Sequence, residues 1–392
     1  MYLPLLLLWV LSPDALAFPA AHLSLGGHSA GIHVRAHEIE EEPHTERPTL
    51  ALATKDRRDH RSRDLADSAR GAAETLAERQ QGPGYWLTAF TDEPRFEKPR
   101  QELNTFTNAV MIDIAEPVAK EAGIAVLLGR TRAFLANQIE ADGLVRYHGR
   151  PDAPTNREVW SCVITPDADD TALVWRIAPG ANRELLSKAL ATLGQFRAAN
   201  GLYKTWLAPQ DRYQCIDPGR DPNPTDIGIQ MHMLMLLAQV DRPAALALCA
   251  ALSKELLDDN FWVYYTRMAP LIPMLRLTDL HKAGCPLQLP QSRLQTAIAD
   301  QRVWVEVVGL VGRLERAQAT SADYARAADL LHQLATNGFS LIKNSPPLLY
   351  HNDFTAHVRR FYWSEDVGYA IWLRLYFETQ RSRPSPHEPA PT

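Results

Sequence analysis

The chain has 392 residues and a mass of 43.9 kDa, which allows one large domain or two smaller ones. Hydrophobic residues make up 46% and charged residues 22%, so a sizeable core can form and general disorder is excluded. The net charge is -5, whereas nucleic-acid-binding proteins usually have an excess of positive charge. A nucleic-acid-binding protein is therefore excluded too.

Residues 1–17 have the pattern of a secretory signal peptide. An apolar run, Leu3–Leu11, is followed by Ala15, Leu16 and Ala17, which form an A-x-A cleavage pattern. The run is too short for an ordinary membrane-spanning helix. We therefore expect a periplasmic or secreted protein; the alternative is membrane association through an uncleaved N-terminal segment.

The folded body is expected within residues 67–380. Residues 18–66 are polar and carry an acidic run at Glu40–Glu42, which is typical of a disordered leader. Residues 381–392 are rich in proline and predict a disordered tail. One domain remains between these ends.

An internal repeat organises this body. A glutamine at the end of a helical stretch is followed within a few residues by a glycine and an aromatic residue. The first three glutamines are 58 and 57 residues apart, and the gap of 138 before the fourth leaves room for one or two degraded copies, one of which is expected around Leu256–Tyr265. The four copies are Gln80 with Gly84, Tyr85 and Trp86; Gln138 with Gly143 and Tyr147; Gln195 with Gly201, Tyr203 and Trp206; and Gln333 with Gly338 and Phe339.

Each copy continues into a second helix with an apolar face. Helical hairpins of this length cannot bury their apolar stripes alone, so about five or six of them must pack side by side. The glycine allows a tight turn and the aromatic wedges neighbouring units, which favours a closed ring over an open superhelix or an ordinary bundle. The predicted fold is all-α: a single α/α toroid of inner and outer helices. The predicted second helices are Thr105–Pro117, Asp169–Ile177, Thr225–Gln239, Met268–Leu277 and Asp366–Phe377.

Four cysteines, Cys162, Cys215, Cys249 and Cys285, show no zinc-site spacing. In an oxidising compartment an even number permits disulfides. Cys162 and Cys215 fall in equivalent loops of adjacent repeats and are the candidate pair. Cys249 lies in an apolar helical stretch and is expected to be a buried thiol.

An acidic cluster, Asp167-Ala168-Asp169-Asp170-Thr171-Ala172, stands at a predicted helix start. One aspartate there is ordinary capping, but three exceed what a cap requires. Repulsion between close carboxylates raises at least one pKa, which keeps a carboxylic acid protonated near neutral pH. A structural or metal-binding cluster is the alternative.

These residues resemble the D-x-D-D-T-A motif of class II terpene cyclases, the squalene-hopene cyclase group. Gln80, Gly84 and Trp86 are similar to the Gln-Trp repeat of that superfamily, whose members are α/α toroids. The resemblance implies an isomerase or lyase that starts isoprenoid cyclisation by protonation. It makes Asp169 the general acid, and Asp167 and Asp170 would orient its proton.

Such chemistry also needs walls that stabilise a carbocation. Aromatic faces do so by about 2 kcal/mol or more each when they are desolvated. For each aromatic residue, core packing is the alternative role. The candidates are Tyr147, Tyr203, Trp206, Trp262, Tyr264, Tyr265, Tyr362 and Trp363.

A second acidic pair, Glu365 and Asp366, occupies the equivalent position in the last repeat. Helix starts of this kind converge on one rim of a closed ring, so both pairs are expected to face one cavity. Carboxylates flanked by aromatics also suit glycoside chemistry, and an exported toroid that acts on or binds a glycan is the alternative function. Other residues expected at this rim are Thr225, Asp226, His351, Asn352 and Asp353, and His148 either orients a motif carboxylate or lies in an exposed loop.

Protonation itself requires no cofactor. Mg2+ is needed only if the substrate carries a diphosphate, whose charge Arg146, Arg150 or Arg157 would meet. The expected partner is a hydrophobic small molecule, with peripheral membrane association and without nucleic acid. A non-enzymatic binding toroid is the third hypothesis.

Overall fold

The structure of the chain, a computed structural model, divides it into two units, Met1–Ala53 and Thr54–Thr392. Apart from the first turn of one helix, the described residues belong to the second unit. The predicted signal peptide, residues 383–392 of the predicted tail, Cys162, Arg157 and Asp353 lie outside the described residues, and Arg381, the first residue of that tail, is the last residue of a helix. The structure describes residues 49–92, 96–151, 163–178, 182–217, 219, 222–265, 269–295, 298–352 and 360–382, with the side chains of residues 49–63 left out.

Inner helices form a closed ring, which confirms the predicted α/α toroid. Each one contacts the next along the chain, and the last, α13, contacts the first, α2. Buried residues run without a break from Ile227 to Leu237 in α7, because the neighbours and the covering helix leave no face to water. The inner helices of the described chain are α2 (Thr105–Ala115), α5 (Ala168–Ile177), α7 (Ile227–Val240), α9 (Leu271–Lys282), α11 (Arg302–Glu315) and α13 (Glu365–Arg381).

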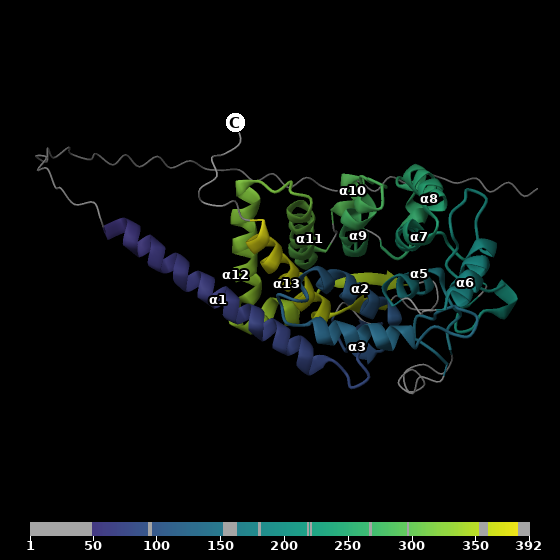
Figure 1. Ribbon diagram of the computed structural model, residues 1–392, viewed down its shortest axis with the longest axis horizontal. Helices are drawn as coiled ribbons and strands as arrows, with labels where there is room; N and C mark the ends of the chain where they lie inside the picture. The colour runs from purple at the N-terminus through teal and green to yellow at the C-terminus, as the bar shows by residue number, and fades with distance from the viewer. Residues whose placement is uncertain are drawn as a thin grey trace, which may run out of the picture. The chain divides into compact units, whose positions relative to one another are not determined.

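Outer helices alternate with the inner ones along the chain (Figure 1). They are amphipathic: in α6 only Ala189 and Leu193 are buried. No helix among the described residues is long and apolar enough to cross a bilayer. The outer helices are α1 (Thr49–Arg79), α3 (Ala125–Ala136), α6 (Arg183–Gln195), α8 (Arg242–Glu255), the short α10 (Gln291–Leu294) and α12 (Ser321–Asn344); 3-10 turns lie at Glu116–Val118, Gln210–Arg212, Asp259–Phe261 and Ala299–Gln301.

Two outer helices differ from the sequence prediction. Helix α1 begins at Thr49, inside the segment assigned to a disordered leader, because its Ala, Leu, Lys and Arg residues favour helix despite their polarity. Helix α12 has a break in which Asn337, Gly338 and Phe339 adopt positive φ angles. This break stands at the predicted turn of the fourth repeat copy, but the chain becomes helical again beyond it and continues to Asn344.

The glycine-aromatic loops are joined to the inner helices by a recurring hydrogen-bond pattern. The Asn108 side chain accepts from the Trp86 backbone N–H at 2.8 Å and donates to its carbonyl at 3.0 Å. Gln230 holds the backbone of Tyr203 in the same way, at 2.8 Å in both directions. The loops therefore position residues at the rim where the inner helices begin.

A four-stranded antiparallel sheet, which the sequence did not predict, links the first and last repeats. Strands β1 (Thr88–Thr91) and β2 (Arg100–Glu102) form one hairpin, and β3 (Leu348–Asn352) and β4 (Arg360–Trp363) form the other. The strand order is β2-β1-β4-β3. Closure of the ring brings the two hairpins together, and their pairing makes one wall at the rim.

One cysteine prediction is wrong. Cys249 of α8 is bonded to Cys285, which follows α9, so it is not a free thiol. The apolar pattern around Cys249 could not show this, because the partner comes close only when α8 packs beside the next hairpin. Cys215 is also disulfide-bonded, and its predicted partner Cys162 lies outside the described residues.

We expect Gly143→Ala to destabilise the fold strongly. Gly143 has a φ of +85°, and a Cβ atom there would overlap the Leu185 carbonyl oxygen. Together these effects should lower the free energy of unfolding in urea by about 3 kcal/mol. The matched control is Gly129→Ala in α3, where nothing lies within 4 Å of the new atom; it should raise stability by about 0.5–1 kcal/mol. Equal effects of the two changes would contradict this account of the turn.

Candidate active site

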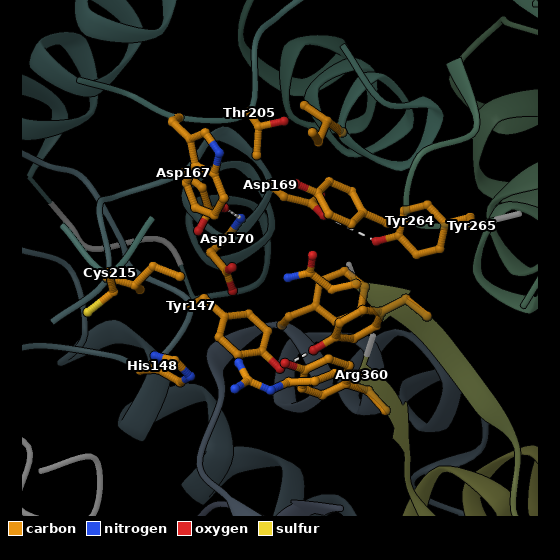
Figure 2. A pocket seen from close by; sticks show the side chains of 17 residues that line it. Tyr147, His148, Asp167, Asp169, Asp170, Thr205, Cys215, Tyr264, Tyr265 and Arg360 are labelled. Carbon is orange, nitrogen blue, oxygen red and sulfur yellow. Dashed lines mark hydrogen bonds between the residues drawn. The ribbon is translucent and has the colours of Figure 1, made fainter. Parts of the chain in front are cut away.

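A cavity of about 110 Å³ lies where α2, α5 and α7 begin, beneath the loops and the β3–β4 hairpin (Figure 2). The acidic motif, a group of tyrosines and a few hydrogen-bonding side chains meet there. The lining residues are Phe106, Tyr147, His148, Ile164, Asp167, Asp169, Asp170, Thr205, Trp206, Cys215, Ile229, Tyr264, Tyr265, Tyr350, Asn352, Arg360 and Tyr362.

All three motif aspartates line this cavity, but each is held differently. Asp167 caps α5: its backbone is extended, and its Oδ1 accepts from the Asp170 N–H at 2.7 Å. Asp170 is buried and accepts the hydroxyl hydrogen of Thr105 from α2. The Asp169 side chain is 13% exposed. Capping thus accounts for one carboxylate and leaves the other two for a separate role.

The cavity keeps these carboxyl groups protonated up to neutral pH. Burial raises the pKa of Asp169 to about 7, against the opposing effects of Arg276 and of a hydrogen bond from Tyr265. Burial also raises the pKa of Asp170 to about 7, although the Thr105 hydroxyl lowers it. Burial and the Asp170 charge raise the pKa of Asp167 well above its usual range. The expectation of a raised pKa in this cluster agrees with the geometry, although burial contributes more than repulsion.

A buried chain of side chains from three inner helices supports Asp169. Arg276 of α9 donates from Nε to His232 Nε2 at 2.7 Å and from Nη1 to Asp113 Oδ2 at 2.6 Å. His232 of α7 therefore carries its hydrogen on Nδ1, which donates to Asp169 Oδ1. The opposite oxygen, Oδ2, accepts from the Tyr265 hydroxyl at 3.3 Å.

The charges along this chain fix its protonation. Burial, Arg276 and Arg176 lower the pKa of His232 well below its usual range, so the imidazole is neutral. Burial alone would raise the pKa of Asp113, but Arg276 and Arg176 hold it below its usual range. Arg276 and Asp113 thus compensate each other's buried charge and leave His232 as a fixed neutral donor. His232 is not among the residues expected from the sequence, although a lone histidine within the apolar run of α7 is a signal.

Aromatic rings make most of the remaining wall. Five of the predicted candidates line the cavity, and Phe106 and Tyr350 join them. Tyr350 stacks on Tyr362 with centroids 4.5 Å apart and meets Phe106 edge-on at 5.3 Å. Gly228 makes room for one ring, because a Cβ atom there would overlap Tyr265. The predicted candidates found at the cavity are Tyr147, Trp206, Tyr264, Tyr265 and Tyr362.

Three other predicted aromatics are core residues away from the cavity lining. Tyr203 is buried beneath Arg197, whose guanidinium carbon lies 4.9 Å from the ring centre. Trp262 is buried and donates to the Leu256 carbonyl at 3.0 Å. Trp363 packs in a small cluster and meets Phe96 edge-on. Packing between neighbouring elements is therefore the role that the structure shows for these three aromatics.

The second acidic pair does not join the first. Arg79 at the end of α1 donates to Asp366 Oδ1 at 2.6 Å, and its Nη1 lies 3.2 Å from Glu365 Oε2. This counter-ion holds the pair against the outer helix. Ser364 takes the cap position that Asp167 has in α5, so neither acidic residue is the cap of α13. Asp226 is likewise a structural group, since its carboxylate accepts from the backbone N–H groups of Gly228, Val263 and Tyr264.

The other polar candidates divide between the cavity and its surroundings. His148 and Asn352 line it, as does Arg360, which is not among the residues expected from the sequence. His351 is buried and stacks on Phe361. Arg146 donates to Glu140 and to the Ile164 carbonyl, both at 2.6 Å. The remaining diphosphate candidate that the structure describes, Arg150, lies in the turn after His148, where its backbone N–H donates to Gln138.

No family model and no curated protein matches the sequence. Among solved structures, cellobiose 2-epimerase from Spirochaeta thermophila DSM 6192 is similar, with 13% identity, a TM-score of 0.50 and coverage of 85% of this chain and 99% of that one. A type II terpene cyclase from Scytonema in complex with geranylgeranyl dihydroxybenzoate has 13% identity, 82% and 99% coverage and a TM-score of 0.29. A protein from Actinoplanes has 15% identity, 80% and 99% coverage and a TM-score of 0.42. The epimerase likeness supports the α/α toroid fold and nothing finer.

We expect Asp170→Asn to change how stability depends on pH. The pKa of Asp170 is raised from 3.8 to about 7 in the folded chain, so between these values the folded state holds a proton that the unfolded state releases. The group's contribution to stability is complete below pH 4 and is lost as pH rises to 7, by up to about 1.4 kcal/mol per pH unit. Urea unfolding from pH 4 to 8 should show this slope in the difference between wild type and variant.

The exposed Asp211→Asn provides the control, because its side chain lies in a surface turn. Its stability should follow wild type at every pH. A difference between wild type and Asp170→Asn that stays constant over the range would contradict the assignment.

Proposed function

We propose that this protein is a class II terpene cyclase-like enzyme that starts the cyclisation of an isoprenoid by protonating it from Asp169. The observation that carries the proposal is the state of Asp169: a carboxyl group with a pKa of about 7 at the wall of an aromatic cavity, held by a neutral histidine. Proton transfer to an alkene creates a bare carbocation, so the acid must keep its proton until a substrate is bound and must release it where water is excluded.

The hydrogen bonds around Asp169 favour release of its proton into the cavity. Oδ1 already accepts the His232 hydrogen, so the proton of the neutral acid belongs on Oδ2, beside Tyr265. When that proton leaves, the new carboxylate is stabilised by both donors and by the nearby Arg276 guanidinium, which lowers the pKa of Asp169. These interactions strengthen as the charge develops, which is the condition for catalysis.

The walls suit a cationic intermediate. Tyr147, Trp206 and Tyr265 present aromatic faces or edges around the carboxyl cluster, and Phe106 packs among them. An aromatic face attracts a desolvated cation by about 2 kcal/mol without forming a bond that would trap it. Hydrocarbon substrates of the isoprenoid class fit such a lining.

The proposal also covers the compartment in which the enzyme works and the condition under which it needs Mg2+. The Cys249–Cys285 disulfide supports an oxidising compartment, as export through the N-terminal segment would provide. An exported enzyme would meet its isoprenoid in or beside a membrane. Mg2+ enters only with a diphosphate-bearing substrate.

Turnover in D2O tests the proposal directly. Wild type, incubated with squalene, geranylgeraniol or geranylgeranyl diphosphate, should give a cyclised product that carries a single deuterium at the protonated carbon, seen by mass spectrometry. Asp169→Asn should lower the rate by about 10²–10⁴-fold, because the amide cannot give a proton, and Asp211→Asn should match wild type. Cyclised product without deuterium, or full activity of Asp169→Asn, would falsify the assignment.

The pH dependence of kcat/KM gives a second test. Because the pKa of Asp169 is about 7, the active protonated form dominates below that pH, and the rate should fall about tenfold per pH unit above it. Rates from pH 5 to 9, with circular dichroism to check folding, measure this. A rate that rises through pH 7 would show that a base, and not an acid, limits the reaction.

A glycan is the second candidate substrate. The observation that favours it is the set of hydrogen-bonding groups on the cavity wall, Thr205, Asn352 and Arg360, together with the paired carboxyls. Glycoside hydrolysis also uses an acid with a raised pKa beside a second carboxylate. Release of reducing sugar by wild type, lost in Asp170→Asn, would support this candidate over the first.

A further inference from the structure

The loop that follows the 3-10 turn Asp259–Phe261 carries a hydrogen-bond donor to the proposed acid. The Tyr265 hydroxyl donates to Asp169 Oδ2 at 3.3 Å, and its ring stacks on Phe106 with centroids 6.3 Å apart. Burial and the charges of Asp169 and Asp226 raise the pKa of Tyr265 well above its usual range, so the phenol keeps its hydrogen. Tyr265 can act as a fixed donor only where its loop is held in place.

Asp226 holds that loop with one carboxylate oxygen. Its Oδ2 accepts from the backbone N–H groups of Val263 at 2.8 Å and Tyr264 at 3.0 Å. On the other side of the loop, the Tyr264 carbonyl accepts from the His351 N–H of β3 at 3.2 Å. The two residues that precede Tyr265 are thus tied both to the start of α7 and to the sheet.

The other oxygen of Asp226 fixes the backbone beneath the tyrosine ring. Oδ1 accepts from the Gly228 N–H at 2.8 Å, which is the capping bond of α7. The Tyr265 ring lies so close to Gly228 that a Cβ atom there would overlap it. Asp226 itself is 0% exposed. One buried carboxyl group therefore fixes both the support of the ring and the chain that carries the ring.

Capping alone does not require a carboxylate at this position. An N-cap needs one acceptor oxygen, and asparagine or serine provides it as well as aspartate does. Asp226 instead meets three N–H groups with two oxygens, and burial raises its pKa to about 7 although these donors lower it. A buried carboxyl group is costly unless its hydrogen bonds are used. The second oxygen is the part of Asp226 that capping leaves unexplained.

We propose that Asp226 is a positioning residue for the acid: it holds the Tyr265 hydroxyl against Asp169 Oδ2, where that hydroxyl stabilises the carboxylate left by proton transfer. Among the described residues, Asp226 lies outside the cavity lining, so it acts through Tyr265 and not by touching the substrate. This inference rests on the proposed function.

Three substitutions in the full-length protein test this role. Asp226→Asn offers one acceptor oxygen where two are used, so it cannot keep both the cap at Gly228 and the loop. Either loss moves Tyr265, because Gly228 supports its ring. Asp226→Ser keeps a capping oxygen and removes the one that holds the loop. Tyr265→Phe removes the hydroxyl alone.

Asp241→Asn is the matched control. Asp241 caps the outer helix α8, where its side chain accepts from the Ala244 N–H at 3.1 Å. The substitution is the same as at Asp226, and the position is again a helix cap. Its turnover rate and pH profile should match those of wild type.

The rate of turnover of the three isoprenoids named above, followed by deuterium incorporation, gives the first readout. Tyr265→Phe should lower kcat about 10–100-fold, because a hydrogen bond to a developing charge is lost. Asp226→Asn should lower kcat by a similar factor. In the Tyr265→Phe background, Asp226→Asn should cost less than about threefold more, since the hydroxyl that Asp226 positions is already gone.

The pH profile of kcat/KM gives a readout that general loosening of the fold does not move. The hydrogen bond from Tyr265 lowers the pKa of Asp169, so without it the fall in rate above pH 7 should shift to higher pH. Asp226→Asn should shift the profile in the same direction. If Asp226 acted by its own charge, its removal would shift the profile to lower pH, because a nearby negative charge raises the pKa of an acid.

Two results would overturn the inference and leave the proposed function intact: additive effects of Asp226→Asn and Tyr265→Phe, or a shift of the Asp226→Asn profile to lower pH. Asp226→Ser replaces Asp226→Asn if circular dichroism shows that the latter does not fold. Failure of both to fold would also overturn the inference, because Asp226 would then serve the fold itself.

Failure of wild type to turn over any of the isoprenoids would instead remove the proposed function. The contact is then tested by the same double-mutant cycle in urea unfolding. Coupling between the substitutions at Asp226 and Tyr265 would support the positioning of the tyrosine, and additive effects would contradict it.

Discussion

The contact between α13 and α2 closes the ring, and the site depends on that closure. Inner helices such as α7 are mostly apolar and buried on every face, so they need neighbours on both sides. An open arrangement would leave the free flanks of α2 and α13 in water. Closure also brings the first and last hairpins together through the pairing of β1 with β4, and β3 and β4 supply one wall of the cavity. The same packing that stabilises the fold therefore shapes the site.

Exclusion of water by the closed ring explains the electrostatics of the site. Burial is the largest influence on the pKa of Asp167, Asp169 and Asp170, and in each case it favours the neutral acid. The same burial would make an isolated guanidinium costly, and Arg276 is tolerated because Asp113 neutralises it. A protonated acid, a neutral histidine and a buried ion pair are thus consequences of one water-poor interior.

Much of the fold could be predicted because its cause is local. The Gln-Gly-aromatic spacing marks where outer helices end, and the apolar stretches mark most of the inner helices. Helix α11 was not recognised separately, since the copy before it has no clear aromatic signal and its outer helix α10 spans only Gln291–Leu294. The sheet was also missed: its strands have three to five residues and gain partners only when the ring closes.

By itself the sequence determined the toroid, the acidic motif and the rim at which that motif stands, because repeat spacing and helix capping act within a few residues. Only the tertiary structure decided which groups meet there. His232 and Arg276 approach Asp169 from other repeats, Arg79 draws Glu365 and Asp366 away, and Tyr203 and Trp262 turn into the core. The reason is physical: charge pairing and desolvation depend on distances across the ring, and these are set by packing between helices far apart in the chain.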